Sequence, residues 1–323
     1  MTNEHRIVCG AAAQSDPKGR LFLRIDEADV HAELKVSHLR RHFLKEMPDI
    51  LADLLEVAAY VYAADSAISR GGSVASKMGQ EWRRSLQFEV PVRRREIWED
   101  QTTHRLLTET LGFLSEDTYS FAFHDHPRHG VEAAIPFLDL SEDDAWRPDE
   151  VIMFSGGLDS LAGALEAVLD RQNRVALVSH SSAPVMTRVQ RELANVLAGM
   201  GREGRPDRVR HFPIRARMQD RALKEGSHRS RSFLFATLGV VIARSFGLDR
   251  IDFCENGIVS LNLPLLAQHV GTRATRSTHP QALKGLSELF AALLGDTVRI
   301  GNPLFWKTKT MSCTESTNLA VRT

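Results

Sequence analysis

The chain has 323 residues, of which 43% are hydrophobic and 25% charged, values that are ordinary for a soluble globular protein with room for two domains. Lys plus Arg and Asp plus Glu each number 41, so no strong net charge draws the whole molecule to nucleic acid or to anionic lipid. Three separated cysteines make no CxxC pair and no disulfide framework. Because residues 1–10 show no signal peptide and no apolar run is long enough for a membrane span, we expect a cytoplasmic protein without a membrane partner.

The first part of the chain, residues 1–140, reads as a small α+β domain. Apolar residues at helical spacing predict a helix over Met47–Ile68, and the glycines of Arg70–Gln80 predict a loop after it. Alternating apolar residues predict a strand at Leu86–Val92. A short helix at Leu106–Leu114 and a strand at Thr118–Phe123 follow.

An acidic stretch with a proline, Asp139–Glu150, is the predicted linker to a second domain over residues 150–310. There the pattern becomes an alternation of short apolar strands and amphipathic helices. Such strands argue for a parallel sheet that helices cover on both faces. The predicted strands are Val151–Phe154, Arg174–Ser179, Arg208–Ile214 and one within Arg250–Gly257; the predicted helices are Leu158–Arg171, Pro184–Met200 and Ser230–Phe246.

The first strand of this second part runs directly into the sequence SGGLDS, Ser155–Ser160. Gly156 and Gly157 let the main chain approach an anion without a Cβ atom in the way. The helix that begins near Leu158 adds the positive end of its dipole, and the two serines add hydroxyl donors. Asp159 would repel a bare phosphate, so we expect it to hold the loop in shape or to contact a Mg²⁺ ion on the phosphates.

This loop lacks the lysine of a Walker A sequence and does not match GxGxxG. It resembles the PP-loop, SGGxDS, of the N-type ATP pyrophosphatases, which implies an adenine nucleotide alpha hydrolase-like fold. In that superfamily the loop binds the β- and γ-phosphates of ATP, a substrate oxygen attacks the α-phosphorus, and pyrophosphate leaves. The resemblance makes every residue of the loop an ATP contact, Leu158 included, and makes Ser155, Asp159 and Ser160 catalytic candidates.

Polar residues that follow the later strands supply further candidates. The second strand ends at Ser179 and His180, where the superfamily contacts adenosine; a helix-capping or surface role is the alternative for the histidine. Arg229 and Arg231 open the third predicted helix, and arginine is suited to bidentate contact with phosphate or carboxylate. We expect both to bind the nucleotide and Arg231 also to be catalytic, with solvated surface arginines as the alternative.

The fourth strand leads into Glu255, Asn256 and Gly257, which we expect to contact the nucleotide because dense polar groups after a buried strand more often mark a site than a plain loop. Lys307 and Lys309, in WKTKT, are placed to face pyrophosphate, or else lie on an exposed loop. The remaining polar members of this group are Asn262, Arg273, Arg276, Thr278 and His279.

Together these residues resemble the 7-cyano-7-deazaguanine synthase family (QueC-like) over Val151–Lys309. The likeness is strong at SGGLDS and looser at RSRSFLF, ENG and STHP. The longer chain, with AAYVYAADSAISRGG at Ala58–Gly72, resembles the synthase-like (QatC-type) component of bacterial antiviral islands of the Qat type. The resemblance implies ATP and Mg²⁺ as cofactors, a small deazapurine acid as substrate, and a place in queuosine-type biosynthesis or in anti-phage defence.

The reaction implied by the resemblance begins when a 7-deazaguanine carboxylate attacks the α-phosphorus of ATP. Ammonia then converts the acyl-adenylate to an amide, and a second activation gives the nitrile. In the antiviral relatives the acceptor could instead be an amine on a protein partner, or nucleic acid. The extra N-terminal domain and the seven arginines of Arg202–Arg221 motivate that alternative.

The chain departs from the synthase family at its end. The family carries a zinc site of four cysteines, whereas here only Cys313 lies in that region, so no zinc site is predicted in this chain. Residues 311–323 read as an irregular tail, cut short or divergent. Two further interpretations therefore remain: another PP-loop enzyme that amidates a different acid or modifies a tRNA base, and a nucleotide-binding subunit whose chemistry is impaired.

Overall fold

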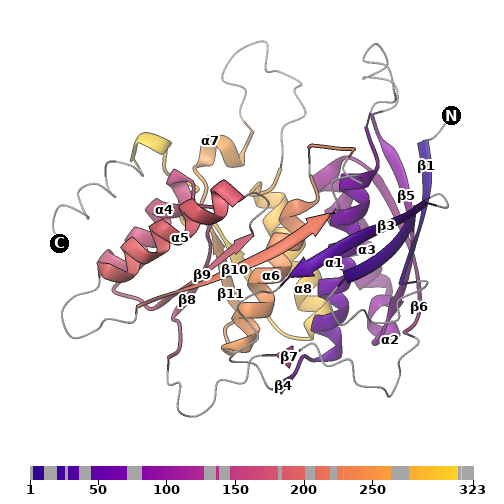
Figure 1. Cartoon of the computed structure of the whole chain (residues 1–323), viewed down its shortest axis with the longest axis horizontal. Helices are drawn as coiled ribbons and strands as arrows, with labels where there is room; N and C mark the ends of the chain where they lie inside the picture. Colours follow the sequence, from indigo (N-terminus) through magenta and orange to yellow (C-terminus); the bar gives the residue numbers. More distant parts are fainter. Residues whose placement is uncertain are drawn as a thin grey trace.

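The computed structural model describes residues 3–10, 20–25, 28–35, 45–70, 82–126, 136–137, 146–180, 184–200, 208–218, 224–227, 229–262, 276–311 and 314. Their fold is mixed α/β and centres on one ten-stranded sheet, with strand order β12-β11-β8-β9-β10-β3-β2-β1-β5-β6 (Figure 1). Its strands are β1 (Asn3–Cys9), β2 (Arg20–Ile25), β3 (Ala28–Lys35), β5 (Arg84–Val92), β6 (Thr118–Asp125), β8 (Glu150–Met153), β9 (Val175–His180), β10 (Val209–Met218), β11 (Arg250–Phe253) and β12 (Arg299–Gly301).

Parallel pairing dominates this sheet. The pairs β12–β11, β11–β8, β8–β9, β9–β10, β1–β5 and β5–β6 are parallel, and only β10–β3, β3–β2 and β2–β1 are antiparallel. The β3–β10 pair, with Arg215 opposite Lys35 and Met218 opposite Ala32, makes the sheet continuous between the two halves of the chain. The predicted boundary at residues 139–150 lies before β8, and the segments on either side of it share this sheet.

Helices cover both faces of the strands β8 to β11. Ile152 and Phe154 pack on one face with α4 (Leu158–Leu165) and α5 (Pro184–Gly199). Val151 and Met153, which alternate with them, face the larger core beside α6 (Arg231–Ser245) and α8 (Pro280–Leu294). This alternation confirms the predicted sheet with helices on both faces, because successive side chains of a strand point to opposite sides.

The N-terminal half packs on the sheet through α1 (Asp49–Ala67), a helix buried on nearly all sides. Such a helix is typical of the centre of a core. It contacts α6, α8 and the strands β2, β3 and β10, so it lies between the two halves of the molecule (Figure 1). The other described elements are β4 (Lys45–Glu46), β7 (Pro136–Phe137), α2 (Arg95–Trp98), α3 (Gln101–Ser115), the π-helical turn Glu166–Asp170 and α7 (Gly257–Ser260).

The structure confirms the predicted elements and lengthens some of them. The short helix expected at Leu106–Leu114 is part of the longer helix α3. This helix begins earlier because Asp100 accepts hydrogen bonds from the N–H groups of Thr102 and Thr103, both at 3.0 Å. The strands β1, β2, β3 and β12 and the helix α8 were not predicted. The predicted loop at Arg70–Gln80 and the predicted tail lie almost wholly outside the described residues.

Candidate functional site

The carboxyl edge of the parallel strands contains a topological switch point. The chain passes from β8 outward to β9 and β10, and then returns through α6 to β11 on the other side of β8. In open α/β sheets, ligands bind in the crevice beyond the carboxyl ends of the two strands that flank such a point. SGGLDS follows β8 and ENG follows β11, so these two motifs lie at the carboxyl ends of neighbouring parallel strands.

Hydroxyl groups close the SGGLDS loop on itself. Ser160 Oγ donates to Gly157 O at 2.9 Å, so its 3.1 Å contact with Ser155 Oγ is one in which Ser155 donates. Ser155 Oγ in turn accepts from Gly157 N at 3.2 Å. Gly156 has a φ of +79°, which a residue with a side chain rarely adopts. The result is a tight turn that exposes Ser155, Gly157 and Leu158 and buries Asp159 and Ser160.

The first turn of α4 leaves donors available at this turn. The N–H groups of Leu158, Asp159 and Ser160 have no intrahelical acceptor by position, and no side chain caps the helix. The exposed glycine Gly157 stands directly before them. Backbone N–H groups and the positive end of the helix dipole face the same spot here, an arrangement that suits an anion.

Gln190 of α5 supports the loop, and it was not predicted. Its side chain is buried, and its Nε2 donates to Ser155 O at 3.0 Å. A Cβ atom at Gly156 would lie 2.9 Å from Gln190 Cγ, so the close packing of this glutamine and the positive φ both require glycine there. Gln190 thus holds the main chain of the loop at Ser155 and Gly156 against α5.

Asp159 and Glu255 form a pair of interacting carboxyl groups, which we call the carboxyl pair. Burial raises the pKa of Glu255 to about 8, and its hydrogen bond with Asp159 and the negative charge of that residue add to the rise. For Asp159, burial is outweighed by the contacts with Glu255 and Asn256 and by the charge of Lys309, and its pKa is lowered. Near neutral pH the pair therefore carries about one negative charge and shares a proton.

Asn256 and Asn302 hold the carboxyl pair in place. Asn256 Nδ2 donates to Asp159 Oδ2 at 2.9 Å, and its Oδ1 accepts from Val259 N at 3.2 Å to cap α7. Asn302 Nδ2 donates to Glu255 O at 2.8 Å, and its Oδ1 accepts from Glu255 N at 3.1 Å. Asn302 was not predicted, and it anchors the main chain of Glu255 to the segment after β12.

Gly257 is needed for a close backbone approach. A Cβ atom there would lie 2.1 Å from Phe305 O, and the N–H group of Gly257 donates to Lys307 O at 3.2 Å. The N–H of this glycine is therefore occupied within the fold. Its role is to let the segment 302–309 pass close to α7, which brings the exposed Lys309 near the carboxyl pair.

The carboxyl pair fits a Mg²⁺ ion. Mg²⁺ prefers oxygen ligands and is usually held by one or two carboxylates together with substrate phosphates. Asp159 Oδ1 is buried and, apart from the contact of Asp159 with Glu255, has no hydrogen-bond partner among the described residues, so it can serve as a ligand to a cation. Among the residues that the structure describes, no group of three or more His, Cys, Asp or Glu side chains could hold a metal without such phosphates.

Two predicted residues at the end of β9 differ in their surroundings. Ser179 is fully buried; its Oγ donates to Phe154 O at 2.7 Å and accepts from His211 Nε2 at 2.9 Å, so its side chain is occupied within the fold. His180 is half-buried and contacts the ring of Tyr62 edge-on, with ring centroids 5.9 Å apart. Of the two, only His180 has part of its surface exposed at the carboxyl end of β9.

Arg229 and Lys307 have partners within the fold, whereas Arg231 is exposed. Arg229 is buried, with its guanidinium 5.2 Å from the centroid of the Trp82 ring and 3.6 Å from Glu116. Burial and the charge of Arg70 lower the pKa of Arg229. Lys307 Nζ lies 3.0 Å from Glu166, past the far end of α4. Arg231, at the start of α6, is exposed at the carboxyl edge.

The outer members of the predicted group connect the site to the N-terminal half. Arg276 donates to Phe113 O at 3.0 Å and to Glu116 at 2.7 Å, and Thr278 Oγ1 lies 3.1 Å from Ser260 Oγ. His279 caps α8 by accepting from Gln281 N at 3.2 Å. Asn262 has a φ of +53°. Arg273 and Cys313 lie outside the described residues.

No family model matches the chain, and no curated protein matches it. In the part that the structure describes, none of the helices has both the length and the apolar character needed to cross a bilayer.

Proposed function

We propose that this protein binds ATP at the carboxyl edge of β8 and β11 and uses it to activate a carboxylic acid, releasing pyrophosphate. One observation carries the proposal: the uncapped turn Ser155–Ser160 and the Asp159–Glu255 pair lie together at the switch point of the sheet. An anion-binding helix terminus beside a cation-binding carboxyl pair suits a polyphosphate with its metal ion.

Different groups of the chain bind different parts of ATP. The N–H groups of the loop and the first turn of α4 bind the β- and γ-phosphates and stabilise the charge that grows on pyrophosphate as it leaves. Lys309, which is exposed and close to the carboxyl pair, adds positive charge on the same side. His180 and Arg231 border the part of the crevice beyond β9, where the adenosine and the acid would lie.

Asp159, oriented by Asn256, and Glu255, anchored by Asn302, are the residues that would hold Mg²⁺. When bound, the ion supplies charge neutralisation at the phosphates.

In the chemical step, an oxygen of the acid forms a bond to the α-phosphorus, and the bond between that phosphorus and the bridging oxygen breaks. The electron pair leaves with pyrophosphate, and the products are an acyl-adenylate and pyrophosphate. An amine then attacks the acyl carbon, AMP departs, and the amine loses one proton to give an amide. The protein contributes alignment of two anions and electrostatic stabilisation, and no side chain forms a covalent bond to the substrate.

For the acid we propose a 7-deazaguanine carboxylate, because SGGLDS, ENG and STHP resemble the 7-cyano-7-deazaguanine synthase family. The product would be an amide or a nitrile, or the acyl group would pass to a macromolecular acceptor in anti-phage defence. Amidation of another acid, or modification of a tRNA base, would use the same loop and carboxyl pair, and the identity of the acid distinguishes these activities.

The test is pyrophosphate release from ATP and Mg²⁺, measured with and without 7-carboxy-7-deazaguanine and ammonia. The wild-type chain is compared with Asp159→Asn and with Glu109→Gln, a control on the exposed side of α3 that pairs with Arg105. We expect acid-dependent release that falls at least about 100-fold in Asp159→Asn and is unchanged in Glu109→Gln. ATP binding without release under any condition would instead support a nucleotide-binding subunit, and absence of ATP binding would refute the proposal.

A further inference from the structure

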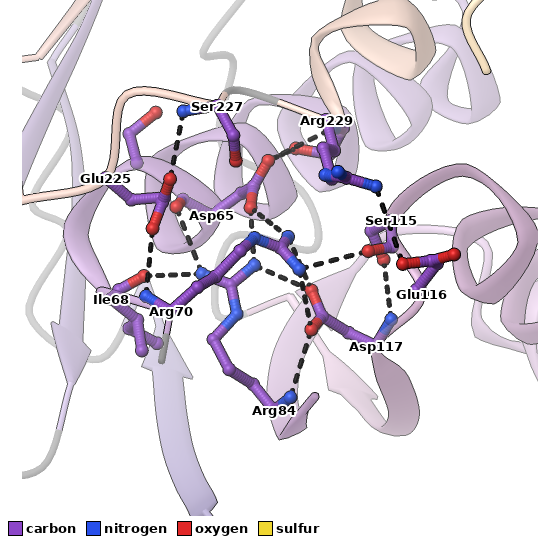
Figure 2. Close-up of polar contacts among 12 residues, drawn as sticks. Asp65, Ile68, Arg70, Arg84, Ser115, Glu116, Asp117, Glu225, Ser227 and Arg229 are labelled. Carbon is purple, nitrogen blue, oxygen red and sulfur yellow. Dashed lines mark hydrogen bonds and ion pairs between the residues drawn. The ribbon is translucent and has the colours of Figure 1, made fainter. Parts of the chain in front are cut away.

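Four buried charged residues of the N-terminal half lie together next to the start of α6, and we call them the buried charge cluster. Asp65 is at the end of α1, Arg70 follows it, Arg84 begins β5, and Asp117 precedes β6 (Figure 2). The Nη2 atoms of both arginines lie between the aspartates, at 2.8 and 2.5 Å from Asp65 Oδ1 and at 2.7 and 2.6 Å from Asp117 Oδ2. Two positive and two negative charges balance, as burial requires.

The two aspartates of this cluster differ in one respect. Both oxygens of Asp117 accept from the arginines, and Oδ1 also accepts from Arg84 N at 3.0 Å. Asp65 uses only Oδ1 for the arginines; its Oδ2 accepts from both Ser230 N and Ser230 Oγ, each at 2.9 Å. Ser230 is the residue directly before α6, so Asp65 holds the start of that helix.

This contact replaces the usual cap of α6. A serine at the N-cap position normally accepts from an N–H group of the first turn. Here the Ser230 side chain does not cap α6: the residue has helical dihedrals, φ −80° and ψ −3°, and its hydroxyl donates to Asp65. The carboxylate lies at the positive end of the helix dipole, where a negative charge is stabilising. The first turn of α6 is thereby fixed to α1 and not only to its own preceding loop.

The segment before α6 is also attached to the end of α1. Lys224 N and Glu225 N both donate to Ser66 O at 3.0 Å, and the Glu225 carboxylate accepts from Arg70 N at 2.8 Å. Figure 2 shows Glu225 and Ser227 on one side of the cluster and Arg229 on the other. The chain therefore enters α6 along a path that the N-terminal half determines.

Helix α1 also contacts the end of β9, one turn before Asp65. Tyr62 precedes Asp65 by three residues and contacts His180 at the end of β9. Burial raises the pKa of Tyr62, and the positive charge of Arg231, the exposed first residue of α6, opposes this rise. Arg231, Tyr62 and His180 thus border one region of the carboxyl edge.

We propose that Asp65 is a positioning residue that acts through Ser230 to hold Arg231 toward the nucleotide. This inference rests on the proposed function, because it assigns Arg231 a contact with ATP or with the acid. It gives the sequence AAYVYAADSAISRGG a role, since Tyr62, Asp65 and Arg70 all lie within it.

The cluster offers a matched pair of variants, Asp65→Asn and Asp117→Asn. Each removes one buried negative charge opposite the same two arginines, but only Asp65 contacts Ser230. In Asp65→Asn the single carbonyl oxygen would face the arginines, and the amide donors would face the N–H and hydroxyl donors of Ser230. Ser230→Ala is a milder third variant, which removes one hydrogen bond to Asp65 and keeps the charge cluster.

The main measurement is the dissociation constant of ATP in each variant, alone and combined with Arg231→Ala. Circular dichroism first shows that each variant is folded under the conditions of the titration. We expect Asp65→Asn to weaken ATP binding about tenfold, Ser230→Ala a few-fold and Asp117→Asn less than about twofold. In the Arg231→Ala background the effect of Asp65→Asn should vanish, because both changes remove the same contact. An equal loss with and without Arg231, or an equal loss in the two asparagine variants, would overturn the proposal.

Hydrogen exchange of the amides of Arg231–Phe235 separates this inference from the proposed function. If Asp65 holds the first turn of α6, exchange there should be at least about tenfold faster in Asp65→Asn than in Asp117→Asn, whether or not ATP binds. Faster exchange in a protein that binds no ATP would show that Asp65 holds the first turn of α6 but would reject the proposed function and, with it, the contact of Arg231 with a nucleotide. Equal exchange in the two variants would reject the positioning role.

Discussion

Replacing Gly156 by alanine tests how the phosphate loop is built. The φ of +79° places this residue in a region that costs a residue with a Cβ atom about 1–2 kcal/mol. The new Cβ would also lie 2.9 Å from Gln190 Cγ, in the middle of a buried side chain that cannot move without breaking its hydrogen bond to Ser155 O. Losing that bond adds about 1 kcal/mol. We therefore expect Gly156→Ala to lower the free energy of unfolding by about 2–3 kcal/mol.

Two other glycines provide the controls. A Cβ at Gly157 would lie 3.3 Å from Ser155 Oγ, a group that can rotate away, and its φ is negative, so Gly157→Ala should cost less than about 1 kcal/mol of stability. It should nevertheless weaken ATP binding, since its methyl group stands on the exposed side of the loop. Gly199 is at the end of α5, and a Cβ atom added there would have no neighbouring atom within 4 Å. Gly199→Ala should therefore affect neither the stability nor ATP binding. Urea denaturation and ATP titration of all three variants measure both. Equal stability of the Gly156 and Gly157 variants would refute this account of the loop.

Two further predictions concern charged residues. Lys309→Ala should weaken ATP binding severalfold by titration, because Lys309 lies near the carboxyl pair, whereas Lys307→Ala should change it little, because Lys307 is paired with Glu166. Burial opposes ionisation of Asp65, but its arginine partners prevail and lower its pKa from 3.8 to about 2. Since the folded pKa is the lower one, this stabilisation is complete above about pH 4 and is lost as the pH falls through about 2, a loss of about 2 kcal/mol. Urea denaturation at stepped pH should show that loss in the wild type and not in Asp65→Asn.

The strands and helices after residue 150 could be predicted because each carries its own signal. The strands β8, β9 and β11 are short and apolar, since helices bury them on both faces, and glycine or polar turns bound them. The helix α8 also carried its signals, with His279 as cap, Pro280 in the first turn and Gly295 at a φ of +64° after the end. It was missed because the polar residues before it were interpreted only as a site.

The strands β1 to β3 could not be predicted in the same way, because their partners determine them. In β1, Ile7 and Cys9 are buried, the half-buried Val8 lies between them and only polar residues precede them, so the apolar signal is short. The pairing with β5 and β2 supplies the rest. For the same reason β10 extends past the predicted Ile214 to Met218, where it pairs with β3. Propensity is a weak guide where long-range pairing decides the length of a strand.

The candidate site was predictable where a motif lies directly after a strand, and not where distant residues support it. SGGLDS and ENG follow β8 and β11, so the parallel sheet itself brings Asp159 and Glu255 together. Gln190 and Asn302 are single polar residues without a local signature, and only the packing shows what they hold. Arg229 and Arg231 look alike in the sequence.

What separates these two arginines is the buried charge cluster, and its composition indicates why it is charged. Buried ion pairs add little net stability compared with apolar residues of the same volume. An apolar cluster, however, would offer no acceptor to Ser230 N. This N–H group lies at the start of a helix and therefore has no acceptor within the helix. The carboxylate of Asp65 therefore fixes the direction of α6 as well as its contact with α1. We infer that the cluster contributes conformational specificity at the carboxyl edge more than stability: it fixes Ser230, and on either side of that residue Arg229 lies buried against Trp82 and Arg231 is exposed.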